Sequence, residues 1–473
     1  MKKYARFAAP FRLNALARAS AATVIALCGI SAAHAADNFA LAGYSVASPA
    51  AAAVTAGAAP TQQVTELYRQ LFNRVPDAGG LAYWVGVMRQ GWTIQQVEAS
   101  MMQTAEYRAL HPGSTGGATV STPATAYNYY VSPNGSDTAA GTKAAPFKTL
   151  ARAAKAVTKA GTTVFVAPGT YDGGFKTTAN GTAAARIYWV STTKWGAKIV
   201  PPANSTNKNA WDNRGNYVSI IGFEVDGSKV RSGTKWTLGI YTGGSYNVIE
   251  GNRVHHTATT IPCNSAGGSA IGVDSYYKGV MTDVVGNVVH DIGPAGCTYV
   301  QGIYVSTSGT INNNVVYRVG SAAIHLWHDA TNVKIINNTV SSSVFGIIVG
   351  GGDFYFTSAG ANNVAVYNNI VYDNKYGISE QGKTGAGNSY KNNLVFKNTT
   401  YDWQLRNGLK HTGTISSDPL LAGYSRTAAT PNFKPSASSP VIGRGIATYA
   451  LPTDIDGKAR NASTGYDIGA YQH

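Results

Sequence analysis

The sequence has few charged residues, few cysteines and no long apolar run. Only 13% of its 473 residues are Asp, Glu, Lys or Arg, which excludes a charge-rich disordered chain and a coiled coil. No apolar run reaches the roughly 18 residues that a membrane-spanning helix requires. The 53 glycines follow no three-residue period, which excludes a collagen-like chain. A globular chain rich in glycine and β-branched residues remains, with a formal net charge of +15.

The N-terminus has the features of a secretory signal peptide. Basic residues precede a short apolar stretch, and Ala33-His34-Ala35 matches a cleavage site. We therefore predict a signal peptide over residues 1–35 and a secreted protein, extracellular or periplasmic. Cleavage would remove Cys28 and leave Cys263 and Cys297, a pair that can form a disulfide in an oxidising compartment. It would also remove only basic charges, so we expect the mature chain to stay basic.

Composition divides the next part of the chain into three segments. Residues 36–62 and 111–127 are low in complexity and typical of linkers. Between them, residues 63–110 carry apolar side chains at helical spacing, broken at Pro76 and Gly91, which predicts a small all-α module of three helices. Its R-x-P-D-x-x-G-L-x-Y-W segment resembles a short helical module of unknown function in secreted bacterial proteins. That resemblance implies a cell-surface or export partner.

A repeat of three short strands fills most of the chain after residue 128. An asparagine precedes a valine-rich strand every 24 to 35 residues, and an isoleucine follows most of these anchors. This pattern is typical of a parallel β-helix, whose coils bury apolar residues only by stacking on one another. A sandwich or barrel of hairpins would instead require frequent Asn-Gly or Asp-Gly turns, which are scarce in the repeats. The anchors are Asn252, Asn287, Asn314, Asn338, Asn369 and Asn393, and the isoleucines are Ile271, Ile303, Ile324, Ile347 and Ile378.

The opening segment YYVSPNGSDTAAGTKAAPFKTLARAAKAV, the repeats and the closing DIGAY segment together resemble secreted β-helix proteins related to pectate lyases. The resemblance implies an all-β, right-handed parallel β-helix (solenoid) preceded by the all-α module. Its parts are an N-terminal cap with the first coils over residues 128–190, coils over residues 191–415, and a C-terminal cap over residues 416–473 that closes the other end. Lyases, hydrolases, epimerases and non-catalytic adhesins share this scaffold.

Aligning the isoleucines places outward side chains in one stripe, because alternate residues of a strand face outside. The stripe contains Tyr241, Tyr304 and His325. Two residues further along their strands lie Asp274, Trp327 and Gln381, and His328 lies at the strand end. In related lyases the substrate groove lies along the corresponding sheet.

Two long loops precede this stripe. Cys263 and Cys297 lie at similar distances after their asparagine anchors, in adjacent loops. We therefore predict a disulfide between them, which would make one wall of a groove rigid.

Cleavage of an acidic polysaccharide by β-elimination requires a group that neutralises the uronate carboxylate, a base and an acid. His325 and Lys278 are the candidate bases and Tyr304 is the candidate acid. The remaining predicted substrate contacts are Tyr241, Asp274, Trp327, His328 and Gln381.

The basic charge favours an acidic polysaccharide as the partner. Nucleic acid is not expected, since Lys and Arg are dispersed and the protein is exported. We predict a monomeric polysaccharide lyase. The alternatives are a non-catalytic adhesin on the same scaffold, and a glycoside hydrolase that uses Asp274 with Glu380 or Asp226 with Glu224.

The resemblance implies calcium as a cofactor, but no cofactor follows from the residues alone because carboxylates are sparse. The candidate calcium ligands are Asp274, Asp329 and Asp353. A second outward stripe, rich in histidine, either binds a metal ion or forms a ladder of stacked side chains. It contains Asp226, His255, His290, Tyr317, Ser341 and Tyr372, with His256 and Asp291 beside it.

Overall fold

The computed structural model describes residues 59–72, 74–89, 94, 97, 101, 125–203, 206–228, 236–263, 267–460, 463 and 465–473. The predicted signal peptide, with Cys28, lies outside the described residues, as do most of both predicted linkers. No helix within the described part is long and apolar enough to cross a membrane.

The helical module contains α1 (Pro60–Phe72) and α2 (Ala78–Arg89). The backbone N–H of Gly80 donates to Asp77 Oδ1 at 2.8 Å, which makes Asp77 the N-cap of α2. Of the third predicted helix, only residues 94, 97 and 101 are described, and they are helical. The apolar side chains at helical spacing form one buried cluster: Val64, Leu67, Tyr68, Leu71, Phe72, Trp84, Val85, Val87, Val97 and Met101.

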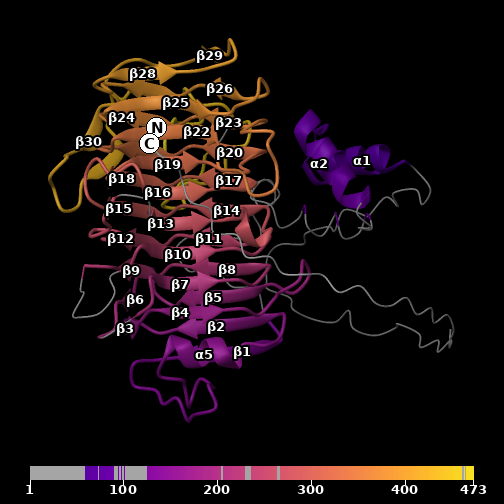
Figure 1. Ribbon diagram of the computed structural model, residues 1–473, viewed down its shortest axis with the longest axis vertical. Coiled ribbons are helices and arrows are strands. Elements are labelled where there is room, and N and C mark those ends of the chain that lie inside the picture. The colour runs from indigo at the N-terminus through magenta and orange to yellow at the C-terminus, as the bar shows by residue number, and fades with distance from the viewer. Residues whose placement is uncertain are drawn as a thin grey trace, which may run out of the picture. The chain divides into compact units, whose positions relative to one another are not determined.

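Most of the remaining described chain is a parallel β-helix with three sheets, whose coils are stacked in chain order (Figure 1). Sheet A contains β1 (Tyr127–Val131), β2 (Thr162–Val166), β5 (Ile187–Ser191), β8 (Val218–Ile221), β11 (Val248–Glu250), β14 (Thr282–Val285), β17 (Gly309–Asn312), β20 (Val333–Ile336), β23 (Ala365–Tyr367), β26 (Ser389–Lys391) and β29 (His411–Thr412). Sheet B contains β3 (Gly169–Asp172), β6 (Ala197–Val200), β9 (Glu224–Asp226), β12 (Arg253–His255), β15 (Val288–Ile292), β18 (Val315–Val319), β21 (Thr339–Ser341), β24 (Ile370–Tyr372) and β27 (Leu394–Phe396). Sheet C contains β4 (Phe175–Thr177), β7 (Asn209–Asn213), β10 (Leu238–Thr242), β13 (Gly268–Val273), β16 (Val300–Val305), β19 (Ala322–Leu326), β22 (Phe345–Gly351), β25 (Tyr376–Gly382) and β28 (Tyr401–Gln404). The predicted β-helix is confirmed.

The core consists of stacked aliphatic side chains. The predicted isoleucine ladder is confirmed, since Ile303 pairs with Ile271 on one side and with Ile324 on the other. The ladder continues through Ile347 to Ile378, and all five side chains are fully buried. Each fully buried isoleucine stabilises the fold by about 1.5–3 kcal/mol.

The predicted asparagine ladder lies at the corner between sheets A and B. The backbone N–H of Asn314 donates to Asn338 Oδ1 at 2.9 Å, and that of Asn338 donates to Asn369 Oδ1 at 2.9 Å. The residue before each anchor has a positive φ, as in Gly286 (62°) and Asn337 (54°). The anchors are therefore buried side chains that satisfy backbone groups at a left-handed turn.

Different elements close the two ends of the solenoid. At the first coil, α5 (Leu150–Ala156) buries Leu150 and Ala153, and the Arg152 N–H donates to Thr149 Oγ1 at 3.0 Å. At the last coil, Trp403, Leu405 and Leu409 pack against the core.

The C-terminal segment, residues 416–473, does not close the last coil as expected. It contains β30 (Leu421–Gly423) and β31 (Asn432–Pro435) and runs back along the side of the solenoid. Three corner asparagines donate from Nδ2 to its carbonyls: Asn313 to Thr453 (2.8 Å), Asn337 to Asp467 (2.9 Å) and Asn368 to Ile446 (2.7 Å). The C-terminus accordingly lies beside the middle coils rather than beyond the last one (Figure 1).

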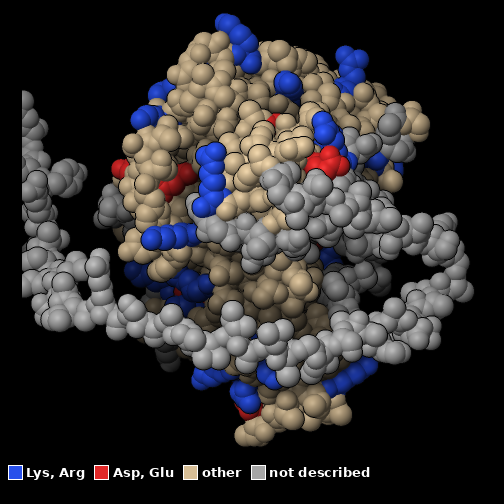
Figure 2. Space-filling view, turned by 90° about the vertical axis from the view of Figure 1, so that its right-hand side faces the viewer, with Lys and Arg blue, Asp and Glu red and all other residues tan. Residues whose placement is uncertain are grey.

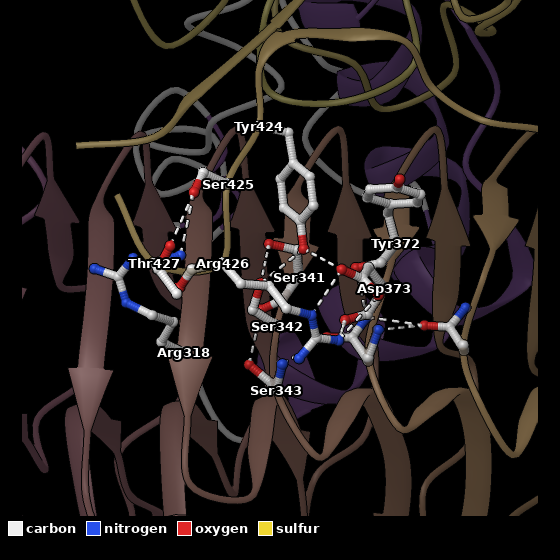
Figure 3. A network of polar contacts seen from close by, with 12 residues as sticks. Arg318, Ser341, Ser342, Ser343, Tyr372, Asp373, Tyr424, Ser425, Arg426 and Thr427 are labelled. Carbon is white, nitrogen blue, oxygen red and sulfur yellow. Dashed lines mark hydrogen bonds and ion pairs between the residues drawn. The ribbon is translucent and has the colours of Figure 1, made fainter. Parts of the chain in front are cut away.

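An ion pair between the buried Asp373 and the half-exposed Arg426 fastens this segment to sheet B (Figure 3). Arg426 Nε donates to Asp373 Oδ2 at 2.8 Å, and the Tyr424 hydroxyl donates to the same oxygen at 2.6 Å. Burial acts to raise the pKa of Asp373, but the hydrogen bonds and charge of Arg426 outweigh it, so the pKa lies below its ordinary value.

We expect Arg426→Ala to lower the free energy of unfolding by about 2 kcal/mol at neutral pH, because it leaves a buried carboxylate without its cation. The lowered pKa means that this contribution is present above about pH 4 and is lost as the pH falls further. Denaturant unfolding at several pH values measures the difference, which should shrink in acid. Arg444→Ala, an exposed arginine of the same segment, is the control, and equal effects of both variants would contradict the assignment.

Candidate functional site

The predicted stripe lies on the outer face of sheet C with the predicted register. Tyr241 pairs with Gly272, Gly272 with Tyr304, and Tyr304 with His325. The stripe begins with Lys176 and Asp212 on earlier coils and continues through Ile348 and Ser379 to Gln404. The strands of sheet C therefore present a row of mostly polar and aromatic residues, interrupted by Gly272 and Ile348.

His325 is more enclosed than a surface base would be. Its ring lies 5.4 Å from the Tyr304 ring and 5.5 Å from the Trp327 ring, centroid to centroid. Both ring nitrogens are buried without a hydrogen-bond partner. Burial, with a smaller contribution from His328, lowers the pKa of His325 to about 3. His325 is therefore uncharged at neutral pH and is a weak base, which does not support its predicted role in proton abstraction.

Tyr241 and Asp274 are held inside the face rather than presented on it. Tyr241, predicted to contact substrate, is only 8% exposed, so little of its ring is open to a ligand. Its hydroxyl donates to Asp274 Oδ2 at 2.8 Å, while Asp274 Oδ1 accepts from Ser306 Oγ and from the Tyr276 N–H, each at 3.0 Å. Asp274 thereby caps the short 3-10 helix η2 (Ser275–Tyr277), and its role is to position that turn.

The turns that follow the strands of sheet C carry a cluster of exposed aromatic side chains. Tyr276 and Tyr277 on η2 are 58% and 52% exposed, and Tyr355 and Phe356 after β22 are 38% and 56% exposed. The Tyr276 ring lies 5.1 Å from that of Tyr277 and 5.5 Å from that of Tyr355. We call these four residues the aromatic platform. Exposed aromatic rings brought together in this way are typical of a binding surface.

Trp327 lies flat beside the platform on a surface made of glycine backbone. A Cβ at Gly350, Gly352 or Gly382 would come within 2.6 to 2.8 Å of its ring. Trp327 Nε1 donates to Asp353 Oδ2 at 3.2 Å. Gln381, predicted to contact substrate, pairs with Gly350 and donates from Nε2 to Ser379 Oγ at 3.1 Å. These contacts keep the indole in one orientation.

His328 and Tyr355 form a hydrogen-bonded pair at the edge of the platform. His328 Nδ1 lies 2.7 Å from the Asp353 carbonyl oxygen, and His328 Nε2 lies 2.9 Å from the Tyr355 hydroxyl. A carbonyl only accepts, so Nδ1 carries the proton in the neutral imidazole and Nε2 faces the phenol with its lone pair. The two rings also stack, with centroids 4.1 Å apart. A fixed tautomer next to a hydroxyl is an arrangement that can transfer a proton.

Positive charge borders the platform on two sides. Lys278 is exposed on the turn after η2, and its Nζ lies 5.6 Å from the Phe356 ring. The Arg214 guanidinium lies 3.6 Å from the centroid of Tyr277 and is held by Asp212, with Nε 2.6 Å from Oδ1. Elsewhere Lys and Arg side chains are dispersed and outnumber Asp and Glu, as one face of the molecule shows (Figure 2).

The predicted disulfide is confirmed. Cys263 and Cys297 are bonded, with their Cα atoms 5.5 Å apart. They lie in the loops that enter β13 and β16, whereas the aromatic platform follows the other ends of the strands of sheet C. The stripe therefore runs between a cross-linked pair of loops and the platform.

The three candidate calcium ligands lie around Tyr355, since besides its burial the charge of each carboxylate raises the pKa of that tyrosine. Asp274 is occupied as described above, Asp329 accepts from Ser275 Oγ and from the N–H groups of Phe356 and Thr357, and Asp353 accepts from Trp327. Within the described residues, only Asp226, His255 and His256 gather as a group that could hold a metal ion. Asp274, Asp329 and Asp353 thus accept hydrogen bonds from neighbouring turns, and their role as calcium ligands stays a prediction.

The two carboxylate pairs considered for glycoside hydrolysis are also occupied. Glu380 is fully buried and accepts from Asn388 Nδ2 (2.8 Å) and the Tyr390 hydroxyl (2.9 Å). Glu224 lies 2.6 Å from Arg253 Nη2 and 3.1 Å from Lys198 Nζ. Neither glutamate is therefore an open acid for a glycosidic oxygen, and the hydrolase alternative stays a prediction.

The residues that sequence reasoning missed are those of the turns. Tyr355 and Phe356 lie in the segment GGDFYF, and Tyr276 and Tyr277 lie in SYYKG. The sequence signal that could have indicated these residues is a pair of aromatic residues next to a glycine and a charged residue. The strand register locates strand residues only, so it could not show that these two turns meet.

Comparisons with known proteins agree with this architecture. Residues 129–285 match the family model described as a Pel9A-like, right handed beta helix region. Residues 45–111 match a domain of unknown function, DUF4214. Both predicted resemblances are thereby confirmed for these residues.

Individual relatives are distant. The protein YwoF of Bacillus subtilis (strain 168), itself uncharacterized, is 26% identical over 304 residues, 57% of this chain, and the chain spans only 62% of the length of that relative. Pectate lyase Pel9A is 16% identical with a TM-score of 0.49, over 74% of this chain and 97% of its own. An alginate lyase from Paenibacillus sp. str. FPU-7 is 17% identical with a TM-score of 0.40, over 56% of this chain and 92% of its own.

Proposed function

We propose that this protein is exported, binds an acidic extracellular polysaccharide across the outer face of sheet C, and cleaves it by β-elimination. The observation that carries the proposal is the aromatic platform, bordered by Lys278 and Arg214. Sugar rings stack on exposed aromatic faces, and Lys278 supplies attraction for a uronate carboxylate, while Arg214 is paired with Asp212. The disulfide supports export, because such bonds persist in oxidising compartments.

The chemistry assigns a role to each group near the platform. Lys278 neutralises the uronate carboxylate, which stabilises the carbanion that forms when the adjacent carbon loses its proton. His328 Nε2, acting directly or through the Tyr355 hydroxyl, takes that proton. The bond from the β carbon to the glycosidic oxygen then breaks, leaving a double bond in the uronate.

The leaving oxygen requires a proton from an acid. The Tyr304 hydroxyl carries a proton at neutral pH, as an ordinary phenol does, and its ring lies 6.0 Å from that of His328, centroid to centroid. We assign it this role, with the neutral His325 packed against it as a positioning residue.

The test is the ultraviolet absorbance of unsaturated uronates, followed over pectate, alginate and bacterial exopolysaccharides. We expect a rise on at least one uronate polymer, and a loss of about 100-fold or more for His328→Gln and for Lys278→Ala. His411→Gln, which changes an exposed histidine on β29, is the matched control.

Two outcomes would contradict the proposal. New reducing ends without any rise in absorbance would indicate a hydrolase. Binding without either product would indicate a non-catalytic adhesin. Full activity of the folded His328→Gln variant would overturn only the assignment of His328 as the base, and the proposed cleavage would stand.

A further inference from the structure

A separate cluster of metal-binding side chains lies on sheet B. It consists of Asp226 at the end of β9, and His255 and His256 at the end of β12. One ligand atom from each lies within 4.8 Å of the others. The two histidine Nδ1 atoms are 2.7 Å apart, and His255 Nδ1 is 3.6 Å from Asp226 Oδ1.

The backbone explains how two consecutive histidines reach the same point. Successive side chains of a strand face opposite ways, but His256 ends the strand with φ 57°, in the left-handed region. This conformation is disfavoured for a residue other than glycine, and it turns the His256 ring towards His255. The next coil has the same geometry, because Asp291 (φ 56°) follows His290.

The carboxylate of Glu224, which is not itself one of the three proposed ligands, orients the His255 ring. His255 Nε2 lies 3.0 Å from Glu224 Oε1, and Glu224 is 3% exposed and held ionised by Lys198 and Arg253. An ionised carboxylate only accepts, so Nε2 carries the proton and Nδ1 presents its lone pair to the cluster. Histidines that bind metal ions commonly have this arrangement, in which a carboxylate fixes the tautomer.

Asp226 has neighbours that a metal ion would have to share or displace. Its Oδ1 accepts from the Ser228 N–H at 2.9 Å and from Ser228 Oγ at 2.5 Å. Arg253 pairs with Glu224, and Arg318 pairs with Asp291 through Nε at 2.6 Å. The cation next to Asp226 is Lys198, whose Nζ is 4.0 Å away and lies closer to Glu224. A divalent cation bound at Asp226 would compete with Lys198 for the carboxylate and would share Oδ1 with the two Ser228 donors.

We propose that Asp226, His255 and His256 form a binding site for a divalent transition-metal ion of the Zn²⁺ type. Two imidazoles and one carboxylate suit Zn²⁺, with a fourth position open to water or an exogenous ligand. Ca²⁺ requires six to eight oxygen ligands, which this cluster does not offer. With metal bonds of about 2.0–2.2 Å, the two Nδ1 atoms must separate to roughly 3.3 Å. The partly exposed His256 ring can make that adjustment.

This site is independent of the proposed polysaccharide site. The cluster lies on sheet B, whereas the aromatic platform follows the strands of sheet C. Loss of metal binding and loss of polysaccharide cleavage can therefore be observed separately.

The experiment is a calorimetric titration of the full chain, prepared without a polyhistidine tag, with Zn²⁺ alone and then with Ca²⁺ alone. We expect one Zn²⁺ per chain with a micromolar or lower dissociation constant. Asp226→Asn and His256→Asn should each weaken it by about 100-fold or more. Asparagine is nearly the size of aspartate and tolerates the left-handed conformation, so both variants should fold. His411→Asn is the control for exposed histidines and should bind like the wild type.

Three results would overturn the proposal. They are no saturable Zn²⁺ binding by the wild type, folded Asp226→Asn and His256→Asn variants that bind as the wild type does, and Ca²⁺ binding at least as tight as Zn²⁺ at the same residues.

Discussion

Asn338→Ala is expected to lower the free energy of unfolding by about 4 kcal/mol. The side chain is fully buried in the middle of the asparagine ladder. Its Oδ1 accepts from the Asn314 N–H at 2.9 Å, and its Nδ2 donates to the Ile311 carbonyl at 2.7 Å. Alanine leaves both backbone groups buried without partners, and each costs about 1–3 kcal/mol. Denaturant unfolding followed by circular dichroism measures the change.

Asn134→Ala is the matched control, since Asn134 is exposed in a loop of the first coil. Its effect should stay within about 0.5 kcal/mol. If the free energy of unfolding of Asn338→Ala lay within about 1 kcal/mol of that of the wild type, the prediction would be contradicted. The hydrogen bonds of the ladder would then contribute little to stability.

Removal of the disulfide is expected to cost about 3–4 kcal/mol. The bond joins Cys263 and Cys297, which are 34 residues apart, and a cross-link over such a loop restricts the unfolded chain by that amount. The double variant Cys263→Ala/Cys297→Ala should therefore unfold at lower denaturant concentration. Limited proteolysis should also detect earlier cleavage in the loops that enter β13 and β16.

A reducing agent provides the control for this prediction. It should destabilise the wild type to the level of the double variant and leave the double variant unchanged. Free thiols at both positions in the oxidised wild type, found by mass mapping, would contradict the pairing.

The repeating part of the fold was predictable because stacking imposes a period on the sequence. The pairing of Tyr304 with His325 follows from aligning Ile303 with Ile324, since a parallel register carries every neighbouring residue with it. The same repeat period also predicted that Cys263 and Cys297 lie close together in adjacent loops. The path of residues 416–473 was not predictable, because Asn313 and Asn337 turn their amides towards a segment more than 100 residues away.

The strand residues of the candidate site were predicted, as were Lys278 and His328 beyond the strand ends, but how the turns pack was not. Burial depends on how turns fold over the sheet, so the sequence could not show that His325 would be enclosed by Tyr304 and Trp327. For the same reason it could not show that Tyr276 would meet Tyr355. The partners of Asp274 and Glu380 come from different coils and turns, which made both carboxylates resemble free groups.

The central claim is that the aromatic platform binds an acidic polysaccharide. Affinity electrophoresis in gels containing the uronate polymer tests it with the variant Tyr276→Ala/Tyr277→Ala/Tyr355→Ala/Phe356→Ala. Tyr127→Ala, which removes an aromatic side chain that is 42% exposed on β1, is the control. A neutral glucan provides the reference gel.

We predict that the wild type and Tyr127→Ala are retarded on the uronate polymer but not on the neutral glucan. The platform variant should lose affinity by about 30-fold or more, since each stacked ring contributes on the order of 1 kcal/mol. Equal retardation of the folded platform variant and the wild type would contradict the account.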